Sequence, residues 1–210
     1  MRTRIKVCGV TRPEDARMAA EAGADYIGVI LTESPRRVSI DRATAIRAAL
    51  PDGIQLVAVF AQEPPEIVEP AARAIGADAV QVAGWMESTP ESAREVWHVV
   101  RAAQLPDPLE LPMVPLRTYL LDAHDEARAG GTGRKADWAW AKRCVDLGRR
   151  LIVAGGLVPE NVTPLILEIR PFGVDASSGL ETEVGRKDPG KVRDFIERIR
   201  AADRERPKRS

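Results

Sequence analysis

Two residues that can move protons stand at the ends of short apolar segments far apart in the chain. Cys8 ends the segment 4–8, and Asp122 ends the segment 119–122. A thiolate can act as a general base and a carboxylic acid as a proton donor when their pKa values lie near neutrality. The structural alternatives are a small buried apolar residue for Cys8 and a capping or salt-bridging carboxylate for Asp122. The two residues alone leave both interpretations open.

Two glycine-rich turns follow apolar segments near the C-terminus, at 154–157 and 177–179. Glycine lets the backbone approach a ligand closely and present its N–H groups, and serine hydroxyls add further donors. These turns predict a phosphate site, with two ordinary tight turns as the alternative. The candidate substrate-binding residues are Gly155, Gly156, Asp175, Ser177, Ser178 and Gly179.

Arg36 follows a proline in the polar segment 32–37. A guanidinium held there could bind a carboxylate through two parallel hydrogen bonds, although a solvated surface arginine is the alternative. His98 and His124 are the only histidines, and neither has a second ligand at metal-binding spacing, so we expect no metal. Cys144 lies among helix-forming residues and is expected to be structural.

Short runs of Val, Ile and Leu alternate with longer runs that have helical periodicity, which predicts βα units. The sequence Ala-Gly-Ala-Asp at 22–25 recurs as Ile-Gly-Ala-Asp at 75–78, each time as a helix stop before a strand. The expected strands are 4–8, 25–31, 54–60, 78–82, 95–101, 119–122, 150–154 and 173–176. The expected helices are 13–21, one capped by Ser39 or Asp41 and ending near Leu50, 64–76, 138–147 capped by Asp137, 159–169 and 189–200.

The middle of the chain permits two assignments. Residues 95–101 are rich in β-branched and aromatic side chains, which favours a strand preceded by a short helix at 88–94. The alternative places one helix over 91–104 and the strand at 112–116. Prolines at 106, 108, 112 and 115 exclude a regular helix between 102 and 118, so the helix after the fifth strand is reduced in either case. The glycine-rich segment 130–137 is expected to be a mobile loop.

Eight strands with intervening helices predict a single (βα)₈ barrel over residues 1–200, followed by a basic, flexible tail at 201–210. A doubly wound open sheet is the competing α/β fold, but its first turn should carry G-x-G-x-x-G, which residues 8–11 lack. In barrels of this kind the active site lies at the C-terminal ends of the strands, where all the candidate residues stand.

The composition limits the classes of partner. The chain carries 31 basic and 31 acidic residues among 210, so its bulk charge gives no support for nucleic-acid binding. No run approaches the roughly 20 apolar residues of a membrane span, so no membrane partner is expected. Two cysteines are too few for a disulfide framework and suit a reducing cytoplasm.

The chain resembles the phosphoribosylanthranilate isomerase family along nearly its whole length and in the family's order. The resemblance lies in several segments. Each segment alone would be weak evidence, but together they are highly specific for the family. They are KVCGVTRPEDA at 6–16, EAGADYIGVI at 21–30, SPRRVS at 34–39, YLLDA at 119–123, GGTG at 130–133 with Asp137-Trp138, AGGLVPENV at 154–162, GVDASSGLET at 173–182 and KDPGKVRDFI at 187–196.

The resemblance implies an Amadori rearrangement of N-(5-phosphoribosyl)anthranilate in tryptophan biosynthesis. Asp122 would be the general acid, Cys8 the base, and Arg36 the ligand of the anthranilate carboxylate. Gly156, Ser178 and Gly179 would hold the phosphate. No cofactor is implied because only protons move, and the protein would be a monomer or homodimer that binds one small phosphorylated substrate.

The fourth expected strand departs from the family. Family members typically read Gln-Leu-His-Gly there, whereas this chain reads Gln-Val-Ala-Gly at 81–84, followed by Trp85 and Met86. This difference keeps two alternative functions open. One is a related isomerase that acts on another phosphosugar amine, and the other is a non-catalytic barrel that binds a phosphorylated metabolite.

Overall fold

The computed structural model describes residues 2–83, 95–101, 107–111, 117–122 and 132–205. The strands of the barrel are β1 (Arg4–Val7), β2 (Tyr26–Ile30), β3 (Gln55–Phe60), β4 (Ala79–Ala83), β5 (Glu95–Arg101), β6 (Arg117–Asp122), β7 (Leu151–Ala154) and β8 (Gly173–Ala176). The helices are α1 (Pro13–Ala22), α2 (Ile40–Ala48), α3 (Pro65–Ala74), α4 (Thr132–Asp146), α5 (Pro159–Ile169) and α6 (Pro189–Glu205). A 3₁₀ turn, η3 (Ser178–Leu180), and a small hairpin, β9 (Glu181–Glu183) and β10 (Arg186–Lys187), lie between β8 and α6.

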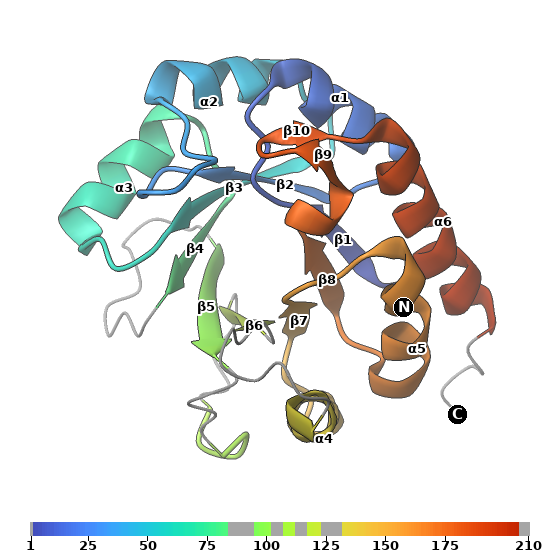
Figure 1. Ribbon diagram of the computed structural model, residues 1–210. Coiled ribbons are helices and arrows are strands. Elements are labelled where there is room, and N and C mark those ends of the chain that lie inside the picture. Colours follow the sequence, from blue (N-terminus) through green and yellow to red (C-terminus); the bar gives the residue numbers. More distant parts are fainter. Residues whose placement is uncertain (1, 84–94, 102–106, 112–116, 123–131, 206–210) are drawn as a thin grey trace.

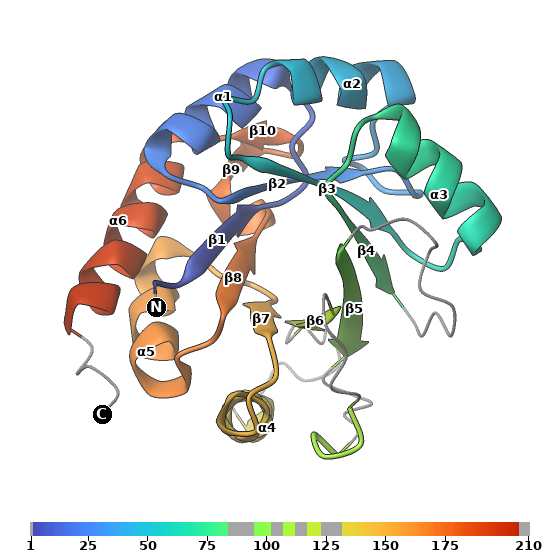
Figure 2. The same cartoon turned by 180° about the vertical axis from the view of Figure 1, so that it is seen from behind.

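The eight strands form a closed parallel barrel in sequence order, which confirms the predicted fold. Strand β1 closes the ring because it pairs with β2 on one side and with β8 on the other. The helices surround the strands, and the β9–β10 hairpin lies over one end of the barrel beside β1 and β8 (Figures 1 and 2). All strand C-termini therefore meet at one mouth.

Alternating side chains of each strand build two packed layers, as the pleat of a strand requires. Outward residues such as Ile5 and Val7 join the core beneath the helices. Inward residues such as Val57, Trp97 and Leu120 fill the barrel interior. Residues Lys6 and Cys8 follow the same alternation, so both side chains of this pair face inward.

The repeated helix–glycine–strand sequence forms the same structure twice at the opposite end of the barrel. Gly23 and Gly76 adopt left-handed φ values of 107° and 62°, which allow the sharp turn after each helix. Asp25 then accepts a hydrogen bond from the backbone N–H of Ile5 at 3.0 Å, and Asp78 accepts one from Leu56 at 2.8 Å. Each aspartate thus ties its own strand to the start of the preceding one.

Several element boundaries differ from the predictions. Helix α4 begins at Thr132, so Asp137 lies inside the helix and is not its N-cap, and residues 132–137 are helical instead of a loop. Helix α6 continues to Glu205, because Ala202 is buried and Asp203 binds Thr3. Residues 201–205 therefore belong to the fold and not to a tail.

The middle of the chain follows the preferred assignment. Residues 95–101 form β5, so the alternative helix over 91–104 is wrong. The described residues after β5, 107–111, form a turn closed by a 2.9 Å hydrogen bond from Glu110 N to Asp107 O. The predicted helix at 88–94, the remaining prolines between 102 and 118, and the glycines at 130–131 lie outside the described residues.

Within the described parts of the chain, no helix combines the length and the apolar character that crossing a membrane requires.

Candidate active site

A cavity of about 310 Å³ opens at the C-terminal ends of the strands. This volume is near the lower end of the usual range for small-molecule sites. Cys8, directly after β1, and Asp122, the last residue of β6, both line it. The other predicted residues in its wall are Gly155, Gly156, Asp175, Ser177, Ser178 and Gly179. The fold therefore brings together all the sequence-predicted site residues except Arg36.

The two glycine-rich turns form one continuous rim of this cavity. Gly155 and Gly156 have φ values of 92° and 63°, a conformation that other residues adopt only with strain. A β-carbon added to Gly179 would lie 2.1 Å from the carbonyl oxygen of Leu157, so η3 packs directly against the turn after β7. Exposed backbone at Gly156 and Ser178 thus faces the same opening.

Cys8 is buried and lies close to charged side chains. Burial raises the pKa of the Cys8 thiol, the Lys6 ammonium acts in the opposite direction, and Asp175 adds to the effect of burial. Lys6 is itself fully buried and donates to Asp175 Oδ2 at 2.7 Å and to Gln81 Oε1 at 2.8 Å. The thiol therefore sits beside an internal ion pair at the floor of the cavity.

Asp175 lines the cavity and belongs to the internal ion pair. Its Oδ2 is bound to Lys6, whereas the buried Oδ1 has no hydrogen-bond partner among the described residues. Burial raises the pKa of the Asp175 carboxyl, Lys6 opposes that effect, and Asp122 reinforces it. The charge of Asp175 therefore depends on Lys6.

Arg36 does hold a carboxylate through two parallel hydrogen bonds, but the carboxylate belongs to Glu181. Its Nε and Nη2 donate to the two Glu181 oxygens at 2.8 and 2.7 Å. Lys187 Nζ donates to the same carboxylate at 2.8 Å. Arg36 also lies against Gly9, where an added β-carbon would be 2.6 Å from its Cδ. Arg36 is therefore held at the edge of the site and does not line the cavity itself.

The sequence prediction missed four polar residues around the site. Lys6 and Gln81 left a signal, because each is a polar residue between two apolar neighbours of its strand. Glu181 and Lys187 left none. Their contact depends on the β9–β10 hairpin, whose short strands resemble an ordinary polar loop in the sequence.

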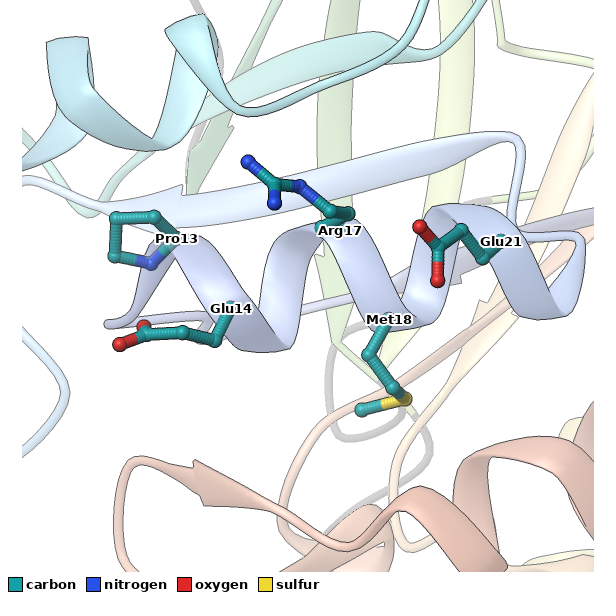
Figure 3. A pocket seen from close by; sticks show the side chains of 5 residues that line it. All are labelled: Pro13, Glu14, Arg17, Met18 and Glu21. Atoms are coloured by element: carbon teal, nitrogen blue, oxygen red, sulfur yellow. The ribbon is translucent and has the colours of Figure 1, made fainter.

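A second hollow on the described surface is lined by residues of α1 alone, Pro13, Glu14, Arg17, Met18 and Glu21. Figure 3 shows these five side chains along the helix. Neither Cys8 nor Asp122 lines this hollow. Among the residues that the structure describes, no three His, Cys, Asp or Glu side chains gather as metal ligands would.

Comparison with known proteins adds an independent line of evidence. Residues 5–198 match the family model described as N-(5'-phosphoribosyl)anthranilate (PRA) isomerase. The chain is 40% identical over 205 residues to the N-(5'-phosphoribosyl)anthranilate isomerase of Trichlorobacter lovleyi, covering 95% of this chain and 98% of the relative.

Solved structures agree with the sequence relatives. One is a phosphoribosylanthranilate isomerase in complex with reduced 1-(o-carboxyphenylamino)-1-deoxyribulose 5-phosphate, with a TM-score of 0.77 and 30% identity. Another contains monomers generated from the dimeric isomerase of Thermotoga maritima, with a TM-score of 0.75 and 30% identity. Each match covers 95% of this chain and 99% of the other.

Proposed function

The chain belongs to the N-(5'-phosphoribosyl)anthranilate isomerase family, and we propose from this premise how its residues carry out the reaction. The protein is an isomerase of tryptophan biosynthesis. It converts N-(5-phosphoribosyl)anthranilate into 1-(2-carboxyphenylamino)-1-deoxyribulose 5-phosphate by an Amadori rearrangement. The conversion shifts protons within one molecule, so an acid and a base in one cavity are the chemical equipment it requires.

Asp122 serves as the general acid and Cys8 as the general base. Asp122 protonates the furanose ring oxygen, the bond between that oxygen and C1 breaks, and the nitrogen lone pair forms a C1=N iminium. The Cys8 thiolate then removes the proton from C2, and the electron pair neutralises the iminium to give an enolamine. The enolamine tautomerises to the ketone product.

The glycine-rich rim binds the phosphate. The backbone N–H groups of Gly156 and Gly179 and the hydroxyl of Ser178 act as donors, and the loops after strands seven and eight are the usual phosphate site of this fold. Ser177 and Gly155 shape the same rim, because both line the cavity.

Two further residues bind the rest of the substrate. Asp175, which lines the cavity, contacts the substrate. Arg36 binds the anthranilate carboxylate. Glu181 already occupies the edge formed by Nε and Nη2, so within the described structure Nη1 is the nitrogen left for the substrate.

The observation that carries this assignment is the presence of Cys8 and Asp122 in the wall of one cavity whose rim is formed by both glycine turns. A barrel that only bound a phosphorylated metabolite would need the rim but neither proton-transfer group. Of the residues in which the fourth strand departs from the family, Val82 and Ala83 lie within the described structure, and neither lines the cavity.

Complementation tests the function in a cell. Expression of the chain in a bacterial strain that lacks this isomerase should restore growth without tryptophan. The variant that combines Cys8→Ala with Asp122→Ala should fail at equal protein level, whereas Cys144→Ala should support growth. Failure of the well-expressed wild-type chain would contradict the assignment of the substrate, and growth of the double variant would contradict the mechanism.

A cytoplasmic monomer or homodimer is the proposed form. The relative from Thermotoga maritima is described as dimeric, and the two free cysteines here are both buried. Light scattering coupled to size-exclusion chromatography gives the mass in solution, which should equal one or two times 22.9 kDa.

A further inference from the structure

Lys6 is a cation enclosed inside the barrel directly beneath the proposed base. It lies two residues before Cys8 on β1, so both side chains face the interior. The Lys6 side chain is 0% exposed, and Lys6 does not line the cavity. It therefore cannot contact a substrate, and any effect on the reaction must pass through its neighbours.

The neighbours of Lys6 fix its ammonium group from three sides. Asp175 lies opposite Lys6 in the register between β1 and β8 and accepts a hydrogen bond at 2.7 Å. Gln81 accepts another at 2.8 Å from β4. The Trp97 ring lies below, with its centroid 5.8 Å from Nζ. A buried ammonium needs such partners, and with them it remains charged.

Gly28 on β2 brings the ammonium and the thiol to the same small space. A β-carbon added there would lie 3.1 Å from Lys6 Nζ, 2.8 Å from Lys6 Cε and 2.9 Å from Cys8 Sγ. Only a residue without a side chain leaves room for both groups. Lys6 is therefore next to the sulfur that would accept the proton.

Charged groups from several elements act on Cys8. Lys6 on β1 and Lys187 on β10 lower the pKa of the thiol that burial raises, and Asp175 on β8 raises it further. Arg36, in the loop after β2, also interacts electrostatically with Cys8. Asp122 on β6 lines the same cavity. Of the two lysines, Lys6 has the larger influence.

We propose that Lys6 is a positioning residue for this reaction: its ammonium stabilises the thiolate of Cys8 and holds the Asp175 carboxylate in place in the wall of the cavity. The alternative is a purely structural ion pair. The proposal rests on the proposed function only for the use of Cys8 as the base. Its electrostatic part concerns the thiol itself and can be measured without substrate.

The pH dependence of Cys8 alkylation by iodoacetamide measures that electrostatic part. All variants carry Cys144→Ala, so that a single thiol reacts. Lys6→Met should raise the apparent pKa of Cys8 by about one unit or more, which lowers alkylation at neutral pH about tenfold. Asp175→Asn should shift the pKa in the opposite direction. A general disturbance of the barrel would not shift the Cys8 pKa in opposite directions in the Lys6→Met and Asp175→Asn proteins.

Lys6→Met leaves a buried carboxylate without its cation and can prevent folding, so a second comparison is needed. Asp175→Asn and the double variant Lys6→Met/Asp175→Asn differ only at residue 6, and neither contains an unpaired buried carboxylate at this site. In Asp175→Asn the ammonium keeps Gln81 as an acceptor and can bind the amide oxygen of the new asparagine. The Cys8 pKa should be about one unit higher in the double variant. Equal values in two folded proteins would overturn the proposal.

The isomerase assay separates this inference from the proposed function. In folded Lys6 variants kcat should fall and KM should change little. The acidic limb of the pH profile, where Cys8 gains its proton, should move to higher pH with the alkylation pKa. A wild-type protein without isomerase activity whose Cys8 pKa still depends on Lys6 would contradict the function and leave the electrostatic inference standing. An unchanged pH profile in an active Lys6 variant would overturn the catalytic part of the inference.

Discussion

At the residue scale, the chemistry of Cys8 depends on a balance between burial and charge. Burial disfavours a thiolate, and the Lys6 and Lys187 ammonium groups favour it. Binding of an anionic substrate brings further negative charge to the cavity, and this charge also disfavours the thiolate. The Lys6 and Lys187 ammonium groups therefore have to offset more negative charge in the complex than in the free protein. The proposed role of Cys8 as a base therefore depends on the charged residues that surround it.

Gly28→Ala tests the space that Lys6 and Cys8 share. The added methyl group would lie within 3 Å of both side chains, so it must displace one of them. We expect kcat to fall by up to about 100-fold, because a small displacement of a reacting group can slow a reaction by this factor. The stability cost of overpacking should be about 1–3 kcal/mol.

Gly53→Ala is the matched control for this variant. Gly53 also lacks a side chain but has nothing within 4 Å of an added β-carbon and a φ of 86°. The Gly53→Ala protein should lose about 1 kcal/mol of unfolding free energy through backbone strain and should keep the wild-type kcat. A Gly28→Ala protein with wild-type kcat would contradict the packing of Lys6 against Cys8.

The candidate site residues were predictable where they stand directly at the end of an apolar strand. Cys8 and Asp122 stand at the ends of apolar strands, and the barrel fold places such ends together. The role of Glu181 as the partner of Arg36 was not predictable, because the two are 145 positions apart and meet through a hairpin without a sequence signal. The sequence pattern indicates which residues lie at the end of a strand. It does not indicate which side chains from distant loops form hydrogen bonds with each other.

At the element scale, the phosphate rim depends on contact between η3 and the turn after β7. An added methyl group at Gly179 would meet Leu157 O at 2.1 Å and Val158 Cγ1 at 2.8 Å. Gly179→Ala should therefore separate the two turns and raise KM about tenfold or more, which corresponds to roughly 1.4 kcal/mol of binding energy. Inhibition by inorganic phosphate should weaken in parallel.

Gly190→Ala, in the first turn of α6, provides the comparison. An added methyl group there meets only the Asp188 side chain, at 3.1 Å, so KM should stay near the wild-type value. Equal KM values in the Gly179→Ala and Gly190→Ala proteins would show that the two turns do not act as one binding site.

Helix α4 carries a second thiol with a different expected behaviour. Burial raises the pKa of Cys144 to about 12. The unfolded thiol has a pKa of about 8.5, so the folded state retains its proton to higher pH. The stability that this provides is fully present below pH ~8.5 and is lost as the pH rises toward 12, by up to ~1.4 kcal/mol per unit.

Cys144→Ala removes this pH dependence. Between pH 8 and pH 10 the wild-type protein should lose about 1–2 kcal/mol more unfolding free energy than the variant, because only the wild type exposes this thiol on unfolding. Urea unfolding in the presence of a reductant measures both proteins. Parallel losses in the two proteins would show that Cys144 does not titrate in this way.

Elements with clear periodicity were predictable to within a few residues, including β5, which follows its β-branched and aromatic content. The start of α4 was not, because Thr132 and Gly133 both have low helix propensity. Helix α4 nevertheless begins at Thr132, so the tertiary structure overrides the local preference there.

At the scale of the whole molecule, the two ends of the chain close the barrel together. Asp203 on α6 accepts hydrogen bonds from Thr3 N at 2.9 Å and from Thr3 Oγ1 at 2.7 Å. Arg200 donates to Thr3 O at 2.6 Å and reaches Asp25 at 3.3 Å. The last helix is therefore attached to the first strand (Figures 1 and 2).

A chain that ends after Arg200 should be less stable than one that ends after Glu205. It loses buried Ala202 and both hydrogen bonds of Asp203, and bonds to a charged group of this kind contribute about 1.5–3 kcal/mol each. We expect a loss of about 3–6 kcal/mol in urea unfolding. Equal stability of the two chains would show that the closing contact contributes nothing.

The central claim is that Cys8 and Asp122 transfer the protons of an Amadori rearrangement. The most direct test is the conversion of N-(5-phosphoribosyl)anthranilate by the purified protein, followed by NMR signals of the 1-deoxyribulose product. Wild type and Cys144→Ala should turn over at the same rate, whereas Cys8→Ala and Asp122→Ala should each lose about 100-fold or more in kcat with little change in KM. A wild-type protein without turnover, or either single variant with wild-type kcat, would contradict the account.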